Sequence, residues 1–164
     1  MLAGAAVPAR LAADTSACER ALNPEERALA RLFEEDRGQR RKKMRCDPWL
    51  TYAAQTKALD MARRGYFNHT TPDREGPNIL VERAGYRLPS FYSHSRTANN
   101  VEVIVAGRPT ADAAWKAWLG SRYHRPLALG LERFYAEQTD YGVGYVHVPT
   151  SPYRDYWVLI SARH

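Results

Sequence analysis

Histidine is the residue type in this sequence best suited to chemistry near neutral pH, and the chain has five histidines. His69 and His124 each stand in a polar turn beside a predicted helix, where scaffolds commonly build sites. His94 lies in a polar loop, and His147 alternates with valines on a predicted strand, so we expect its side chain to point outward. His164 is the final residue and belongs to no pattern. Two imidazoles and a carboxylate can hold a divalent metal ion or share protons.

Glu102 is the only acid in an apolar stretch, VEVIV at residues 101–105. Such a side chain either points to solvent from an edge strand or is buried with a partner, because an unpartnered buried charge is costly. The sequence alone leaves both possibilities open. Other hydrolase signals are missing: there is no GxSxG nucleophile elbow, no HExxH helix and no glycine-rich phosphate loop.

The elements that must position these side chains are helical early in the chain and extended late, which favours an α+β domain. Asparagine or aspartate followed by proline predicts two helix starts, at Asn23 and Asp47, and glycine predicts the end of the second helix at Gly65. Residues 99–105 form either a short strand or the entry to a helix. Further helices are predicted over residues 78–84, from 110 to 119 and around 127–129, and two hairpin strands over 141–148 and 156–162.

Length and composition indicate one globular domain. The chain has 164 residues, of which 45% are hydrophobic and 26% charged. No run of about 18 apolar residues occurs, so we expect no membrane-spanning helix. The net charge of +6 admits nucleic acid, anionic lipid and acidic cell-wall polymers as partners. The basic residues are spread out except in the run RRKKMR at 40–45, which we interpret as a solvated connector. No zinc-finger or RNA-recognition pattern accompanies it, so we expect no specific nucleic-acid partner.

Cys18 and Cys46 have no CxxC neighbour, so redox-motif and zinc-ribbon interpretations are weak. The pair closes a loop as a disulfide in an oxidising compartment, or remains as two buried thiols in a reducing one. Residues 1–9 are small and apolar without a charged leader, and they are therefore not an intact secretory signal. They are either the trimmed end of a signal or a disordered start.

Several short segments, in this order, resemble motifs of the CAP superfamily (cysteine-rich secretory proteins, antigen 5 and pathogenesis-related 1), most closely its bacterial SCP-like branch. The resemblance extends from about Asn23 to Ala162. The segments are DPWLTYAAQ at 47–55, DMARRGYFNHTTPD at 60–73, RAGY at 83–86, EVIVAG at 102–107, WLGSRYHR at 118–125, YGVGY at 141–145 and YW at 156–157.

The resemblance implies a three-layer α-β-α sandwich with a small, mainly antiparallel central sheet and a groove across one face. It implies that His69, Glu102 and His124 form a cluster in that groove. The two histidines are then the metal ligands, holding zinc or another divalent metal weakly, and the carboxylate beside them raises imidazole basicity.

The sequence departs from the family pattern beside this cluster. Ser121 stands where the eukaryotic branch commonly has a second groove glutamate, and Val103 replaces the asparagine that follows the first. Tyr123 replaces the glycine before the second histidine, where it is expected to crowd or cap the ring. Pro126 and Leu127 displace a further asparagine.

The family has no single agreed reaction, so the resemblance leaves three functional hypotheses. We expect a secreted or periplasmic, monomeric, non-enzymatic module that binds a divalent metal and a lipid, a peptide or an anionic cell-envelope polymer. The alternative is a metal-assisted hydrolase of peptide or cell-wall bonds with Glu102 as general base. The third is a structural role, in which hydrogen bonds satisfy His69 and His124.

Export implies an oxidising compartment, so we predict a disulfide between Cys18 and Cys46. The disulfide ties an N-terminal tail, residues 1–22, to the start of the second helix. Residues 23–164 form the single folded domain, and the tail is otherwise partly disordered.

Overall fold

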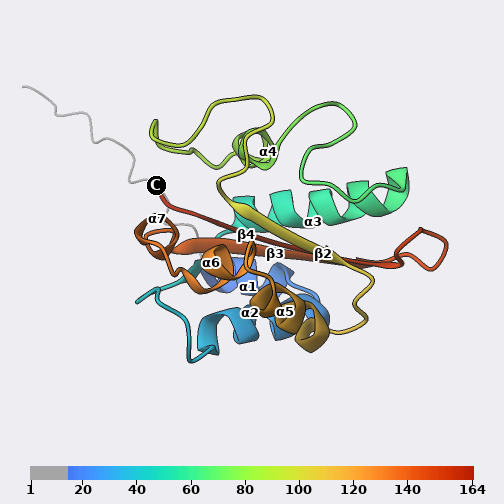
Figure 1. The fold of residues 1–164 in the computed structure, drawn as a ribbon, viewed down its shortest axis with the longest axis horizontal. Helices are drawn as coiled ribbons and strands as arrows, with labels where there is room; N and C mark the ends of the chain where they lie inside the picture. Colours follow the sequence, from blue (N-terminus) through green and yellow to red (C-terminus); the bar gives the residue numbers. More distant parts are fainter. Residues whose placement is uncertain (1–14) are drawn as a thin grey trace, which may run out of the picture.

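The computed structural model describes residues 15–164, and in them helices lie on both sides of a small sheet (Figure 1). Part of the predicted tail is helical, and residues 1–14 lie outside the described part. The elements are α1 (Thr15–Ala21), α2 (Pro24–Glu35), β1 (Arg45–Cys46), α3 (Pro48–Arg64), α4 (Pro77–Ala84), β2 (Glu102–Ala106), α5 (Ala111–Gly120), α6 (Arg125–Leu129), α7 (Arg133–Ala136), β3 (Asp140–His147) and β4 (Asp155–Ala162).

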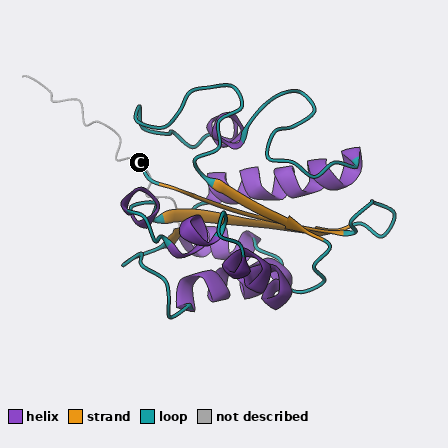
Figure 2. Cartoon of the chain, in the orientation of Figure 1, coloured by secondary structure: helices purple, strands orange, loops and turns teal. Residues whose placement is uncertain are grey.

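The sheet has four strands in the order β1-β3-β4-β2. The short β1 pairs with β3 in parallel, whereas β3 with β4 and β4 with β2 are antiparallel. Helices α3 and α4 cover one face, and α1, α2 and α5 lie on the other (Figures 1 and 2). The predicted α+β class and the three-layer α-β-α arrangement with a mainly antiparallel sheet are confirmed. The stretch 99–105, left open between strand and helix, contributes β2.

The helix boundaries follow from local capping chemistry. The Asn23 side chain accepts from the Glu26 N–H while the Glu26 side chain accepts from the Asn23 N–H, which is a reciprocal capping box. Asp47 accepts from the backbone N–H groups of Trp49 and Leu50 at the start of α3. Gly65 ends α3 with φ of 67°, a left-handed conformation that glycine adopts without steric cost.

Helix α3 lies directly against β3, backbone to backbone. A Cβ atom placed on Gly142 would come within 2.2 Å of the backbone at Leu50 and Thr51, and one on Gly144 within 2.3 Å of the carbonyl carbon of Ala54. Both glycines are therefore required by the close approach of this helix to the sheet.

Two hydrophobic cores fill the spaces on either side of the sheet. One joins α2, α5 and α6 to the sheet, and the other joins α3, α4 and the following loop to it. The largest members of the first are Phe33, Trp115, Trp118, Tyr141 and Trp157, and those of the second are Leu50, Met61, Tyr86, Tyr92, Tyr156 and Ile160.

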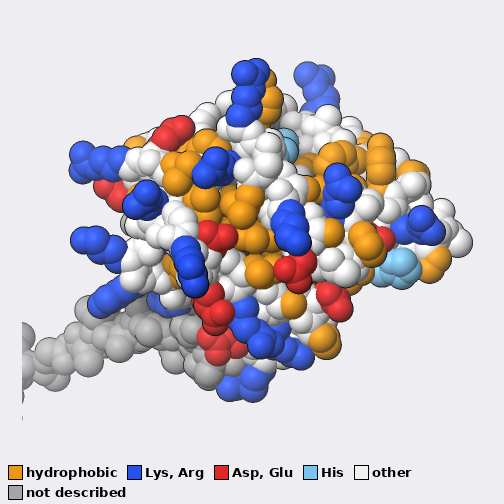
Figure 3. All heavy atoms as spheres, turned by 60° about the horizontal axis from the view of Figure 1, so that its bottom comes forward, with side chains coloured by type: hydrophobic (Ala, Val, Ile, Leu, Met, Phe, Trp, Pro, Cys, Tyr) orange, Lys and Arg blue, Asp and Glu red, His pale blue; other side chains and the backbone are white. Residues whose placement is uncertain are grey.

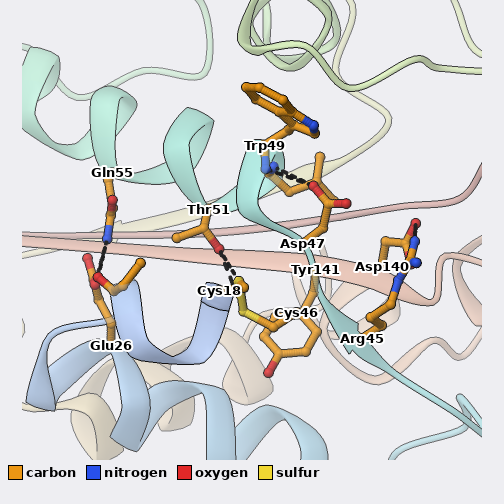
Figure 4. The surroundings of a disulfide bond; sticks show 12 residues. Cys18, Glu26, Arg45, Cys46, Asp47, Trp49, Thr51, Gln55, Asp140 and Tyr141 are labelled. Atoms are coloured by element: carbon orange, nitrogen blue, oxygen red, sulfur yellow. Dashed lines mark hydrogen bonds and ion pairs between the residues drawn. A yellow bond between two sulfur atoms is a disulfide. The ribbon is translucent and has the colours of Figure 1, made fainter. Parts of the chain in front are cut away.

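The predicted disulfide is present. Cys18 of α1 is bonded to Cys46 of β1, and both residues are fully buried. The bond lies beside the first turn of α3, where Thr51 Oγ1 is 3.1 Å from Cys18 Sγ (Figure 4). The sequence separation is 28 residues, for which the chain-entropy model gives roughly 3–4 kcal/mol of stabilisation.

The interpretation of residues 40–45 as a solvated connector is wrong at Arg41. Lys42 and Lys43 are exposed, but Arg41 is only 5% exposed. Its guanidinium donates to the carbonyls of Leu127 and Gln138 and lies over the Phe33 ring, and burial lowers its pKa to about 10. These partners are distant in sequence, so the local pattern did not reveal them.

On the face seen in Figure 3, Lys and Arg side chains lie among acidic and hydrophobic ones without merging into one patch. Within residues 15–164, every helix is too short or too polar to cross a membrane.

Candidate functional site

Glu102 opens the strand β2, and its side chain points inward. The residue is 2% exposed. Asn99 fixes the start of the strand, since its side chain accepts from the Glu102 N–H at 2.9 Å and donates to the Glu102 carbonyl at 3.0 Å. Of the two possibilities that the sequence left open for this acid, the structure supports burial with a partner.

That partner is His69, in the segment that follows α3. The His69 ring donates from Nδ1 to Glu102 Oε1 at 2.8 Å. The His69 side chain is 35% exposed, and that of Glu102 is 1% exposed. Because the carboxylate is buried and accepts this proton, it fixes both the direction of the ring and its tautomer, with the proton on Nδ1.

Lys57 binds the backbone at Asn68 and His69, and the sequence patterns did not predict this contact. It lies on the buried face of α3 and is 2% exposed. Its ammonium donates to the carbonyls of Asn68 at 2.8 Å and His69 at 2.9 Å and to the Tyr66 hydroxyl at 3.2 Å. Burial lowers the pKa of Lys57. The available signal was a lysine at a position where the period of the helix requires an apolar residue.

His124 lies in the turn that leads into α6. Its ring Nδ1 is 2.9 Å from Ser121 Oγ. The backbone N–H of His124 donates to the Ser121 carbonyl in the same turn. Partial burial, and to a smaller extent the nearby His69, lower the pKa of His124 below its ordinary value. Ser121 stands where the eukaryotic branch of the family has its second groove glutamate, and here its hydroxyl contacts His124.

The three predicted side chains come together. The rings of His69 and His124 lie 6.5 Å apart between centroids, with 49° between their planes. Each uses Nδ1 for a hydrogen bond, and within residues 15–164 neither Nε2 atom has a hydrogen-bond partner. The described residues contain no group of three or more histidine, cysteine or acidic side chains spaced to hold a metal ion.

One oxygen of Glu102 is unsatisfied. Oε2 is buried and has no hydrogen-bond partner among the described residues. Leaving a carboxylate oxygen unpaired costs free energy, so such an atom in a native fold points to a group that the protein side chains do not supply.

The departures from the family pattern have visible outcomes. Val103 is 2% exposed and belongs to the core on the α2 side of the sheet. Tyr123, expected to crowd or cap the second histidine, is 74% exposed with the Arg122 guanidinium 4.6 Å from its ring centre. Pro126 occupies the first turn of α6, where proline is favoured.

The other histidines lie apart from this cluster. His147 points outward, as predicted, and its Nδ1 is 2.8 Å from Asp155 Oδ1. His94 is exposed in the loop after α4. His164 lies 2.9 Å from Asp140 and stacks on the Tyr86 ring.

Known proteins resemble this chain in sequence or in fold. No family model matches the chain. Over 105 residues, 64% of the chain, it is 31% identical to the uncharacterized protein YkwD of Bacillus subtilis, and it spans 35% of that protein's length. An outer surface protein of Borrelia burgdorferi has a TM-score of 0.58 at 16% identity, with 84% of this chain and 90% of that one covered. An extracellular protein with an SCP domain from Bacillus anthracis has a TM-score of 0.59 at 18% identity, covering 99% of this chain and 45% of that one.

These structural matches bear out the resemblance that the ordered motifs had indicated. The chain has a bacterial CAP/SCP-like fold. Both solved neighbours are described as extracellular or outer-surface proteins. A fold of this kind hosts several activities, so the function of this SCP-like chain has to be argued from its own side chains.

Proposed function

We propose that this SCP-like chain is an exported binding domain whose His69–His124 pair holds a divalent metal ion. The observation that carries the proposal is the pair of neighbouring rings, each with Nδ1 in a hydrogen bond and, among the described residues, Nε2 without one. An imidazole whose second nitrogen donates to a buried carboxylate is the usual arrangement of a metal-ligating histidine, and His69 with Glu102 has it.

The donor set fits a weakly bound zinc ion. Imidazole suits zinc, copper and nickel. In a tetrahedral site with zinc–nitrogen bonds of about 2.1 Å, two ring centroids lie roughly 5 Å apart, so the present 6.5 Å requires a small approach of the rings. Two protein ligands are fewer than the three or four of tight zinc sites, which favours low affinity and leaves positions for a ligand.

Export is supported by two observations. The structural neighbours are described as extracellular or outer-surface proteins, and Cys18 and Cys46 are paired as in proteins of oxidising compartments. The ligand class is then a lipid, a peptide or an anionic polymer of the cell envelope, toward which the net charge of +6 is favourable.

Calorimetric titration of zinc tests the metal site. We expect one ion per chain in the wild type and a loss of at least about 100-fold in affinity in the double variant His69→Ala/His124→Ala, since both protein ligands are removed. Equal binding by the two proteins would contradict the proposal. A drop in melting temperature with no zinc binding by either protein would instead support a structural role for the two rings.

A metal-assisted hydrolase is the second candidate, and Glu102 Oε2 is the observation that favours it. A bound zinc ion supplies a Lewis acid that lowers the pKa of water. The unpaired carboxylate oxygen is then suited to accept the proton. Zinc-dependent turnover of muropeptides by the wild type, lost in Glu102→Gln, would favour this candidate, and no turnover of muropeptides or peptides would exclude it.

A further inference from the structure

A separate cavity of about 320 Å³ lies between α3, α4 and the segment that follows His69. Helix α4 and its flanking loops lie over α3 in Figure 1. The volume is within the range of roughly 300–1,000 Å³ that is common for small-molecule sites. Neither imidazole of the proposed metal site lines this cavity.

The charged lining of the cavity is balanced. Asp73 pairs with Arg64, whose guanidinium is also 3.7 Å from Asp60. Glu75 pairs with Arg83 and with Arg96, and Arg96 lies outside the lining. The side chains that line the cavity with a positive charge are Lys57, Arg64 and Arg83, and those with a negative charge are Asp60, Asp73 and Glu75, so their charges sum to zero. In a chain of net charge +6, a neutral lining disfavours the selection of ions.

The same pairs leave hydrogen-bonding capacity unused. A guanidinium has five N–H donors and a carboxylate about four acceptor positions, and the pairs described here use only part of them. The Asp73 side chain is 64% exposed and that of Arg83 61% exposed, so both are accessible. Lys57 contributes no free donor, because three oxygens already surround its ammonium.

An aromatic surface stands beside these groups. Tyr52 lines the cavity and remains 59% exposed, and Leu80 and Ala84 add apolar surface from α4. An exposed tyrosine offers a flat apolar face and a polar hydroxyl. The cavity thus combines one aromatic face with neighbouring donors and acceptors and no net charge.

We propose that this cavity binds a neutral saccharide. Each sugar hydroxyl both donates and accepts a hydrogen bond, which matches the alternating guanidinium and carboxylate groups, and the C–H face of a sugar ring packs on an aromatic side chain. An acyl chain would bury charged groups against hydrocarbon. An anionic ligand would gain no net attraction from a lining of three cations and three carboxylates.

Calorimetry and amide chemical shifts on the full chain, with EDTA present, test this proposal with triacetylchitotriose and cellotriose as neutral probes and trigalacturonate as an anionic one. We expect a neutral probe to bind and to shift amides of α3 and α4, with trigalacturonate at least tenfold weaker. Tyr52→Ala and Asp73→Ala should each weaken binding at least fivefold; both side chains are more than half exposed, so neither variant should unfold the chain. Phe91→Ala is the matched control, because Phe91 is 50% exposed and outside the cavity.

Failure of this inference is distinguishable from failure of the metal site. Saccharide binding should persist in His69→Ala/His124→Ala, which removes the proposed metal ligands and no lining residue. Tighter binding of trigalacturonate, equal binding by Tyr52→Ala and wild type, or no binding of either neutral probe would overturn the proposal.

Discussion

Two histidine–carboxylate pairs in this protein have the same hydrogen-bond distance but differ in their surroundings. His69 Nδ1 is 2.8 Å from Glu102, and His147 Nδ1 is 2.8 Å from Asp155. The Glu102 side chain is 1% exposed and that of Asp155 11%, and only His69 has a second imidazole, His124, opposite it within the described residues. A carboxylate therefore directs a ring in both places, but a second imidazole lies close by in only one.

The carboxylates also differ in how fully they are used. Asp155 Oδ1 accepts from both His147 and the Tyr145 hydroxyl. Glu102 Oε1 accepts from His69, whereas its buried Oε2 has no partner among the described residues. In the His147–Asp155 pair one carboxylate oxygen serves two donors, whereas the His69–Glu102 pair retains a buried oxygen with capacity for a further group.

Neutralising each carboxylate should give the largest difference between the pairs. Glu102→Gln should lower zinc affinity about 10–100-fold, because the amide no longer raises the basicity of His69. Asp155→Asn should change it less than about twofold. Competition with a chromophoric chelator measures both, and circular dichroism checks folding. Equal effects of the two substitutions would remove the distinction drawn between the pairs.

Removing a hydroxyl at each place, that of Ser121 beside His124 or that of Tyr145 beside Asp155, should give a smaller difference in zinc affinity. Ser121→Ala removes the partner of His124 Nδ1 and frees the ring to rotate, so we expect zinc affinity to fall about three- to tenfold. Tyr145→Phe removes the phenol bonded to Asp155 and should leave zinc affinity unchanged. The same chelator assay applies, and unchanged affinity in Ser121→Ala would show that the turn alone orients His124.

The pH dependence of the metal-free protein should give the smallest effect. The pKa of His124 is lowered from 6.5 by burial and by His69. The unfolded chain therefore binds this proton more tightly, so the free energy of unfolding decreases as the pH falls below about 6.5. Urea denaturation as a function of pH should show this slope flattened in His124→Asn.

Ring-proton NMR sharpens that test. The pKa of His124 should lie below 6.5 in the wild type and rise partway in His69→Ala, because burial, the larger cause, remains. A His124 pKa at or above 6.5 in the wild type would contradict the surroundings described for this ring.

The sequence predicted those features of the fold that depend on neighbouring residues. The helix starts at Asn23 and Asp47 and the end at Gly65 are decided by capping within a few residues, and the structure has each of them. The hairpin strands follow from two runs rich in aromatic and β-branched residues. Helix α1 was missed because the alanine-rich start of the chain shows no apolar period. The disulfide at Cys18 ties this helix to β1.

What the sequence did not predict depends on contacts between distant residues. The burial of Arg41 rests on carbonyl groups some ninety positions away, such as that of Leu127. The meeting of His69 with Glu102 and His124 was expected from the family resemblance, and composition or periodicity alone did not predict it. Lys57 was detectable in principle, but only by asking why a cation occupies the buried face of a helix.

The backbone contact between α3 and β3 has a consequence for anyone who reshapes this protein. At Gly142 and Gly144 the obstacle to a methyl group is main chain, so no change of rotamer relieves it. Among folded clones from random mutagenesis, these two codons should remain nearly invariant whatever ligand is selected. A library aimed at the histidine cluster or the cavity should therefore keep both glycines fixed and diversify the loops beside the cluster or the cavity.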